Sequence, residues 1–166
     1  MGEIKNYSGS GAIEKLKDLT EGKFCMFCTY SGENMETRPM TTLGIDEDGC
    51  LYFFVKGNST LVSQSEKNSK VDLLYAVGNG DSFTAIKGKA ERSSDKTLVE
   101  KYWTPFAGAY FENENDPTLV LIKVEPGDVH YWEAKDGKII SMAKILITAV
   151  TGEKTDEGRQ GDIEVK

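Results

Sequence analysis

The sequence lacks both an excess of basic residues and any long apolar run. Its 20 Lys and Arg are outnumbered by 27 Asp and Glu, which gives a formal net charge of -7. Nucleic acids and anionic membrane surfaces both attract basic faces, so we expect neither as a partner. No apolar stretch approaches the ~20 residues of a membrane span. The first residues, MGEIKN, lack the basic and then apolar pattern of a secretion signal, so we expect a cytoplasmic protein.

Cysteine and histidine are scarce, which argues against a metal centre. Cys25 and Cys28 form a C-x-x-C pattern on a predicted strand, where residues three apart face opposite sides of a sheet. Adding Cys50 and the single histidine, His130, gives wide and irregular spacing for zinc. Three cysteines without a secretion signal indicate a reducing compartment and buried free thiols. We interpret His130 as a core or interface histidine with a satisfied partner rather than as a general base.

Conventional catalytic motifs are absent as well. The chain contains no G-x-S-x-G nucleophile motif, no phosphate-binding P-loop and no G-x-G-x-x-G dinucleotide motif. Most of its Asp and Glu residues fall in predicted turns and are typical of a solvated surface. The sequence therefore predicts no conventional hydrolytic site.

The 166 residues suffice for one domain with a sizeable core. We assign residues 1–151 to this domain and 152–166 to a polar tail that we expect to be weakly ordered. Helical periodicity, strand-like alternation and turn signals predict the elements. The predicted helices cover about 12–22, 59–66 and a segment from a cap at Ser93 or Ser94 to 103–106, and the predicted strands cover 24–30, 35–45, 51–55, 69–77, 82–92, 118–124 and 129–134.

Three details of this pattern bear on the architecture. Pro39 cannot donate a ladder hydrogen bond, so its strand lies at an edge or is bulged, and Gly88 predicts a bulge in the strand 82–92. The very apolar segment 118–124 is expected to be central. Residues 139–150 are ambiguous, because their Ile and Val content favours a strand whereas their length favours a helix, and we assign them to a helix. Together, the predicted strands, turns and helices indicate an antiparallel, barrel-like α+β domain.

The stretch from Leu51 to Glu66 offers a candidate phosphate site. A strand (51–55) is followed by a turn and by Ser59 or Thr60, either of which can cap the next helix. The free N–H groups of a helix start, beside a hydroxyl and Lys56, suit a phosphate. The alternative is a simple N-cap after a strand.

Arg38 is the second candidate. A guanidinium in the middle of a strand is costly unless it meets an anion. If the strands are neighbours, Arg38 can approach the same phosphate as Ser59 and Thr60. The alternative is a surface ion pair with Glu36, and the spacing alone favours neither.

Taken in order, these segments resemble the general stress protein branch of the pyridoxamine 5'-phosphate oxidase-like superfamily. The resemblance covers nearly the whole chain, from the first helix to Gly152, and it rests on the ordered set rather than on any single motif. The matching segments are ETRPM (36–40), LYFFV (51–55), Ser59 at a helix start, VDLLYA (71–76), GKAE (88–91), YW (102–103), DPTLVLIKV (116–124) and YW (131–132).

The resemblance implies a six- to seven-stranded antiparallel split β-barrel with peripheral helices, and a homodimer with FMN at the subunit interface. It implies that Arg38 and Ser59, with Thr60 beside it, hold the FMN phosphate. The flavin ring and ribityl chain would be lined by Pro39, Met40, Phe54 and Val55, and aromatic residues of the partner subunit, Trp103, Tyr110 and Phe111, would approach the flavin. The implied function is that of an FMN-dependent oxidoreductase whose substrate is unknown.

The chain departs from this family at several places. The family usually has Lys two residues after the helix-start Ser, where this chain has Leu61, and commonly has Thr where this chain has Val55. An aromatic W-F-P motif is replaced by Tyr110-Phe111-Glu112, and the C-terminal Arg motif that binds pyridoxamine phosphate is absent. Oxidation of pyridoxamine phosphate is therefore not expected. The alternatives are a non-enzymatic flavin-binding stress protein, a barrel without its cofactor, or a deazaflavin in place of FMN; a single histidine disfavours haem.

Overall fold

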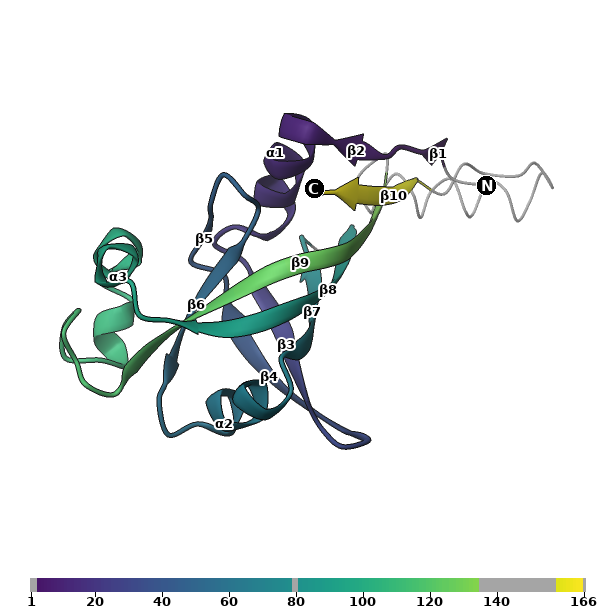
Figure 1. The fold of residues 1–166 in the computed structure, drawn as a ribbon. Coiled ribbons are helices and arrows are strands. Elements are labelled where there is room, and N and C mark those ends of the chain that lie inside the picture. Colours follow the sequence, from purple (N-terminus) through teal and green to yellow (C-terminus); the bar gives the residue numbers. More distant parts are fainter. Residues whose placement is uncertain (1–2, 79–80, 135–157, 166) are drawn as a thin grey trace.

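The computed structural model describes residues 3–78, 81–134 and 158–165, which form one mixed β-sheet with three α-helices and a short 3-10 helix (Figure 1). Ten strands are described rather than six or seven, because short strands near both ends of the chain join the sheet. The strands are β1 (Glu3–Ile4), β2 (Tyr7–Ser8), β3 (Phe24–Ser31), β4 (Asn34–Thr41), β5 (Gly44–Ile45), β6 (Leu51–Lys56), β7 (Lys70–Val77), β8 (Ser82–Ser93), β9 (Leu119–Glu133) and β10 (Arg159–Glu164).

Strand β9 is the centre of the sheet, as its apolar sequence predicted. It pairs with β8 along most of its length, with β6 at residues 119–124 and with β10 at residues 130–133. The prediction of two strands broken at 126–128 is wrong, because β9 is continuous there. Pro126 is tolerated since neither β6 nor β10 pairs with that part of β9.

The predicted bulge at Gly88 is confirmed. The register between β8 and β9 shifts between Ile86 and Gly88, and Gly88 lies opposite Pro126. A Cβ atom at Gly88 would lie 2.6 Å from the carbonyl oxygen of Glu125, so only glycine lets the two backbones approach this closely.

The chain termini depart most from the prediction. Part of the expected weakly ordered tail forms β10, which pairs antiparallel with β9 and parallel with β1 and β2, so the sheet is mixed rather than antiparallel. Ile163 explains this order, because its side chain is buried in the main core. The helix predicted at 139–150 lies outside the described residues.

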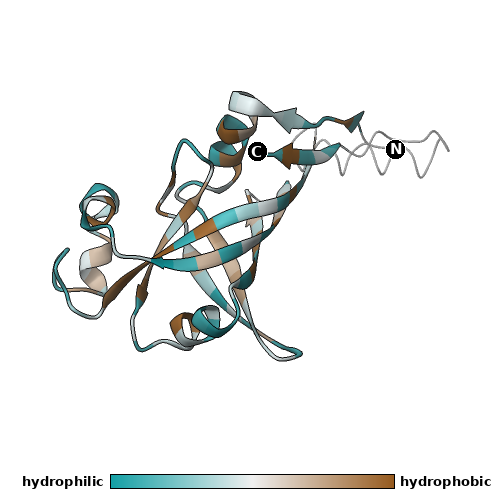
Figure 2. Cartoon of the chain, viewed as in Figure 1, coloured by the Kyte–Doolittle hydropathy of each residue, from teal (hydrophilic) through white to brown (hydrophobic). Residues whose placement is uncertain are grey.

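The helices cover openings of the sheet. Helix α1 (Gly9–Thr20) buries Ala12, Leu16 and Leu19, and helix α2 (Thr60–Lys67) buries Leu61 and Val62. Figure 2 shows hydrophobic residues concentrated on β6 and alternating with hydrophilic ones along β8 and β9. This alternation places one face of the sheet against the core. None of the helices in the described ranges is long and apolar enough to span a membrane.

Helix α3 (Lys96–Tyr102) begins later than predicted. Its N-cap is Asp95, whose carboxylate accepts hydrogen bonds from the backbone N–H (2.9 Å) and the hydroxyl (2.6 Å) of Thr97. These bonds hold the pKa of Asp95 below its usual range. Ser93 instead accepts a bond from the backbone N–H of Asp95 and ends β8, so the caps predicted at Ser93 or Ser94 are wrong.

The sheet of the described residues does not close into a barrel. Strand β4 pairs with β3 on one side and, as Pro39 predicted, is an edge strand on the other. The chain then bends: Thr42 donates its backbone N–H to Lys23 (3.0 Å), and Leu43 donates its backbone N–H to Tyr52 of β6 (2.9 Å). Beyond this bend β4 and β6 diverge without pairing, which leaves an opening between two strand edges.

Candidate functional site

A cavity of about 560 Å³ lies in the opening between β4 and β6. The start of α2 and the segment 104–111, which contains the 3-10 helix Ala107–Ala109, complete its wall. Nine of the ten predicted site residues line it, namely Arg38, Pro39, Met40, Phe54, Val55, Ser59, Thr60, Tyr110 and Phe111. The cavity therefore brings together residues that lie up to 73 positions apart, counted from Arg38 to Phe111.

Arg38 dominates the polar end of this cavity. Its Nη1 donates to the Thr29 hydroxyl (2.7 Å), and its Nη2 donates to the Thr60 hydroxyl (3.4 Å) and to Gln64 Oε1 (3.5 Å). The same Nη2 lies 3.3 Å from a carboxylate oxygen of Glu36. The predicted ion pair with Glu36 is thus confirmed. Arg38 also reaches the first residue of α2, and its role as a phosphate ligand stays a prediction.

The strand register explains why Arg38 reaches α2. The β3–β4 hairpin pairs Ser31 with Asn34, which places Phe27 opposite Arg38 and Thr29 opposite Glu36. Residues paired in register share a face of the sheet, so Arg38 shares the inner face with fully buried Phe27 and Thr29. Thr29 was missed, although the short hairpin turn could have indicated it. Gln64 was also missed, and only the packing of α2 reveals it.

The start of α2 adds backbone donors. Ser59 is the N-cap and its hydroxyl accepts the backbone N–H of Val62 (3.5 Å), so the simple capping role is present. The first N–H groups of a helix have no partner within the helix and favour an anion. Leu61, where the family usually has Lys, is 1% exposed and packs in the core.

Lys56 supplies the other cation of the cavity wall. It is exposed at the end of β6 and lines the cavity. Hydrogen bonds from Thr118 and Glu112 hold the pKa of Asp116 below its usual range, and the Lys56 ammonium contributes to this lowering. Lys56 therefore attracts Asp116, in the loop before β9, as well as any anion in the cavity.

The other end of the cavity is aromatic. Phe54 and Phe111 form an edge-to-face pair with ring centroids 6.3 Å apart, and Phe106 and Tyr110 lie 5.7 Å apart at the exposed rim. Trp103 does not line the cavity; it packs against Phe54, with ring centroids 6.1 Å apart. Tyr110 and Phe111 line the cavity of their own chain, and their expected approach to a flavin across a subunit interface stays a prediction.

The thiols near the site are poor nucleophiles. All three cysteines are buried, as predicted. Burial raises the pKa of Cys25 to about 12. Burial and the neighbouring Asp72 raise the pKa of Cys28, while the Arg38 guanidinium acts in the opposite direction. Because a thiolate is the reactive form, neither thiol supplies a nucleophile at neutral pH.

His130 lies away from the cavity. It is half-buried on β9, and its Nδ1 lies 2.6 Å from a carboxylate oxygen of Asp162 on β10. Its imidazole also packs edge-to-face against Trp132, with ring centroids 4.4 Å apart. The prediction of a histidine with a satisfied partner is confirmed, but the residue is not in the core.

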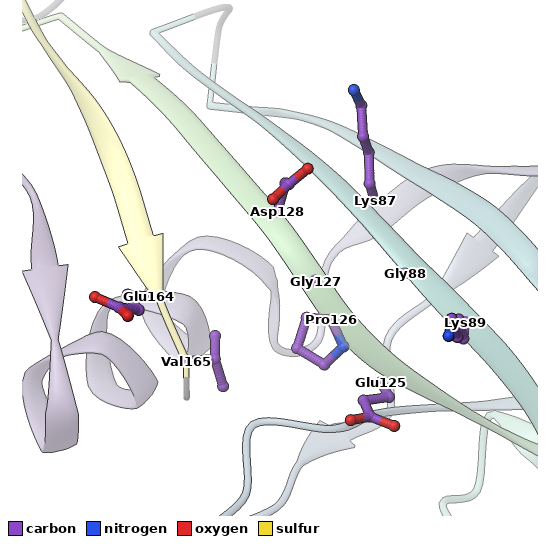
Figure 3. Close-up of a pocket in the computed structure, with 9 residues that line it drawn as sticks. All are labelled: Lys87, Gly88, Lys89, Glu125, Pro126, Gly127, Asp128, Glu164 and Val165. Carbon is purple, nitrogen blue, oxygen red and sulfur yellow. The ribbon is translucent and has the colours of Figure 1, made fainter.

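A second cavity, of about 500 Å³, lies at the bulge between β8 and β9. Figure 3 shows Lys87 and Lys89 on β8, Glu125 and Asp128 on β9, and Glu164 near the end of β10. Its cations lie on β8 and its carboxylates on β9 and β10, and its lining contains no aromatic residue and none of the predicted site residues. The cavity between β4 and β6 is therefore the stronger candidate.

The outer face of the sheet carries a separate apolar surface. Four side chains that are 41–46% exposed lie on four adjacent strands, namely Met26, Leu74, Phe83 and Trp132. The register pairs Met26 with Leu74, and Phe83 with Trp132, so the four share one face. This outer apolar surface meets the cavity near Pro39, which lies opposite Met26 and also lines the cavity wall.

The chemistry of the main cavity suits a ligand with two different ends. Small-molecule sites commonly have volumes of about 300–1,000 Å³ and a few polar groups in an apolar lining. Here the guanidinium of Arg38 and the start of α2 fit a phosphate, and the Phe54–Phe111 end fits a planar ring. These residues therefore fit a flavin mononucleotide.

Comparison with known proteins agrees with the ordered motifs of the sequence. The family described as "Pyridoxamine 5'-phosphate oxidase like" matches residues 11–156. General stress protein 26 of Bacillus subtilis is 29% identical over 80 residues, which cover 46% of this chain and 57% of that protein. The matched segment thus spans little more than half of this curated relative.

Solved structures show the same fold. A candidate general stress protein 26 from Jannaschia sp. CCS1 has a TM-score of 0.73 and 20% identity, over 91% of this chain and 94% of its own. The general stress FMN/FAD binding protein of Xanthomonas citri has a TM-score of 0.66 and 23% identity, over 76% and 90%. The resemblance predicted from the sequence is confirmed, and the chain belongs to the pyridoxamine 5'-phosphate oxidase-like family.

Proposed function

We propose that this protein binds FMN in the cavity between β4 and β6. The observation that carries the proposal is the position of Arg38, whose Nη2 lies 3.4 Å from the Thr60 hydroxyl at the start of α2. Two independent anion-binding features therefore converge on one place. Related structures described as FMN/FAD binding in Xanthomonas citri and as FMN binding in Nostoc punctiforme support this choice of ligand.

In this proposal one set of residues binds the flavin and another excludes water from its ring. Arg38, Ser59 and Thr60 hold the phosphate, while Pro39 and Met40 line the ribityl chain. Phe54, Val55 and Phe111 shield the ring from solvent. The flavin, when bound, supplies the transfer of one or two electrons, and the protein orients it and sets its surroundings.

We propose further that the bound flavin makes the protein an oxidoreductase. Apart from Arg38 and Lys56, Tyr110 is the only ionisable side chain among the described residues that line the cavity. Redox chemistry carried by a flavin needs no dedicated acid or base, which is consistent with this lining. A non-enzymatic flavin-binding protein is the second candidate, and it is favoured by Leu61, which removes a cation from the phosphate end.

The proposed assembly is a homodimer formed through the outer apolar surface. Exposed contiguous apolar side chains commonly mark an interface, and this surface adjoins the cavity at Pro39. Leu74→Arg would place a charge at its middle, whereas Ile4→Arg changes an exposed residue on the edge strand β1. Sedimentation velocity is expected to find a dimer that Leu74→Arg alone dissociates; a wild-type monomer would contradict the dimer.

The test of FMN binding is a titration that follows quenching of flavin fluorescence. Arg38→Ala removes charge-assisted bonds worth about 1.5–3 kcal/mol each, so the dissociation constant is expected to rise by about 10- to 100-fold. Arg92→Ala, an exposed arginine on β8 outside the cavity lining, is the matched control and should bind FMN as the wild type does. A wild-type protein that does not quench FMN would contradict the proposal.

A further inference from the structure

The two terminal nitrogens of Arg38 have different surroundings. Nη1 donates to Thr29, whose hydroxyl is buried and also donates to Gln64 Oε1 (2.5 Å). Nη2 donates to Gln64 Oε1 (3.5 Å) and, on its exposed side, to the Thr60 hydroxyl (3.4 Å) and the carboxylate of Glu36 (3.3 Å). The bonds to Thr29 and Gln64 therefore hold the guanidinium in place, while the exposed side of Nη2 is directed to the phosphate position proposed beside α2.

That outward nitrogen already has an anion beside it. Glu36 lies two residues before Arg38 on β4, so both side chains are on the same face of the strand. The Glu36 side chain is 49% exposed, and among the described residues its carboxylate pairs with Arg38 alone. It is therefore free to swing into solvent when another anion takes its place.

The charge balance makes this carboxylate important. The described cavity wall provides two cations, Arg38 and Lys56, and the position of a third is occupied by buried Leu61. Glu36 offsets one of the two positive charges, while a flavin phosphate carries close to two negative charges at neutral pH. Glu36 and the phosphate thus compete for the same nitrogen, and they also repel each other.

We propose that Glu36 is a resident anion that a ligand phosphate must displace from Arg38. Glu36 thereby lowers the affinity of the site for FMN and determines how strongly the site prefers FMN to riboflavin, which has no phosphate. The inference rests on the proposed flavin site but concerns its specificity. It makes Glu36 a specificity-determining residue, distinct from the residues that hold the flavin.

A purely structural role for Glu36 makes the opposite prediction. If the pair with Arg38 only orders the hairpin, Glu36→Gln loosens Arg38 and weakens the binding of any anion. If Glu36 competes with the ligand, Glu36→Gln strengthens phosphate binding and leaves riboflavin binding unchanged. Glu33→Gln, an exposed substitution in the turn of the same hairpin, changes the net charge equally without touching Arg38.

The first arm of the experiment needs no flavin. The melting temperature is measured against inorganic phosphate at constant ionic strength, since a ligand of the folded state raises it. We expect Glu36→Gln to lower the apparent dissociation constant for phosphate about three- to fivefold, with no change for Glu33→Gln. The gain should vanish in the Glu36→Gln, Arg38→Ala double variant, because the two residues act on one site.

The second arm titrates FMN and riboflavin by fluorescence quenching. Glu36→Gln should raise the ratio of FMN affinity to riboflavin affinity about three- to fivefold. An unchanged or lower phosphate affinity in Glu36→Gln overturns the inference, even if FMN binds the wild type. A protein that binds no flavin but gains phosphate affinity in Glu36→Gln keeps the role of Glu36 and overturns the flavin proposal.

Discussion

The two ends of the cavity are held in different ways. At the polar end, Arg38 is fixed by bonds to a buried hydroxyl on β3 and to residues of α2. At the aromatic end, Phe106 and Tyr110 are each 59% exposed and lie on a segment whose regular structure is one short 3-10 helix. The polar end is therefore preorganised, whereas the aromatic rim can adjust to a ligand or to a second subunit.

The difference between the two ends bears on how strongly each contributes to binding. A preorganised group loses little conformational freedom on binding, so it contributes more affinity than a mobile one. We therefore expect substitutions that disturb the support of Arg38 to exceed those at the rim, even though the rim residues would contact more of the ligand.

Among substitutions that leave Arg38 itself in place, the largest effect is expected for Thr29→Val. It removes the hydroxyl that accepts from Arg38 and donates to Gln64, and an unsatisfied buried group costs about 1–3 kcal/mol. We expect the free energy of unfolding in urea to fall by about that amount and the FMN dissociation constant to rise about tenfold. Thr37→Val, at an exposed position of β4, is the control. Wild-type FMN affinity in Thr29→Val would show that Arg38 needs no support from β3.

A smaller effect is expected for Ser59→Ala. Losing an N-cap costs about 0.5–2 kcal/mol, and the hydroxyl of Ser59 caps α2 through Val62. The FMN dissociation constant should rise about threefold, because the helix start is less ordered while Arg38 remains. Ser63→Ala, in the exposed first turn of α2, should change FMN binding little. Equal losses in both variants would assign the effect to general weakening of the helix.

The rim should respond least. Phe106→Ala and Tyr110→Ala each remove an exposed ring, and we expect the FMN dissociation constant to rise about two- to threefold in each. The melting-temperature response to inorganic phosphate should stay unchanged, because both rings lie on the segment 104–111, whereas the groups assigned to the phosphate lie on β4 and at the start of α2. A rim variant that weakens FMN binding more than Thr29→Val does would contradict the claim that the polar end contributes more affinity than the rim.

Strand β3, which supports Arg38, also makes the free energy of unfolding depend on pH in the alkaline range. Burial raises the pKa of Cys25 on β3 from 9.0 to about 12, so the folded state retains a proton that the unfolded chain releases. The contribution of this group to stability is complete below pH 9 and is lost as the pH rises to about 12. Cys25→Ala should show a shallower fall of the unfolding free energy between pH 9 and 12. An identical slope would exclude Cys25 as a cause.

Much of this site could be predicted because its signals are local. Arg38 and Pro39 stand out within one strand, and Ser59 follows a strand and a turn, so propensity and capping rules suffice. Thr29 could have been predicted from the sequence, since the turn at Ser31–Asn34 fixes the hairpin register. Gln64 could not have been predicted, because no sequence rule gives the packing of α2 over β3.

The errors in the fold have a related cause. Pro126 is a strong local signal for a break, yet β9 runs through it because the neighbouring strands leave that stretch unpaired. The C-terminal segment is polar on average, but Ile163 is enough to bury its middle when β9 and the N-terminal strands offer partners. Contacts between distant parts of the chain decide both cases, and a local window does not contain them.

The most direct test of the phosphate end is a calorimetric titration of the wild type and Arg38→Ala with FMN and with riboflavin. We predict that the wild type binds FMN at least about tenfold more tightly than riboflavin, and that Arg38→Ala binds the two with nearly equal affinity. Equal affinities in the wild type, or a preference for FMN that survives in Arg38→Ala, would contradict the assignment of Arg38 to the flavin phosphate.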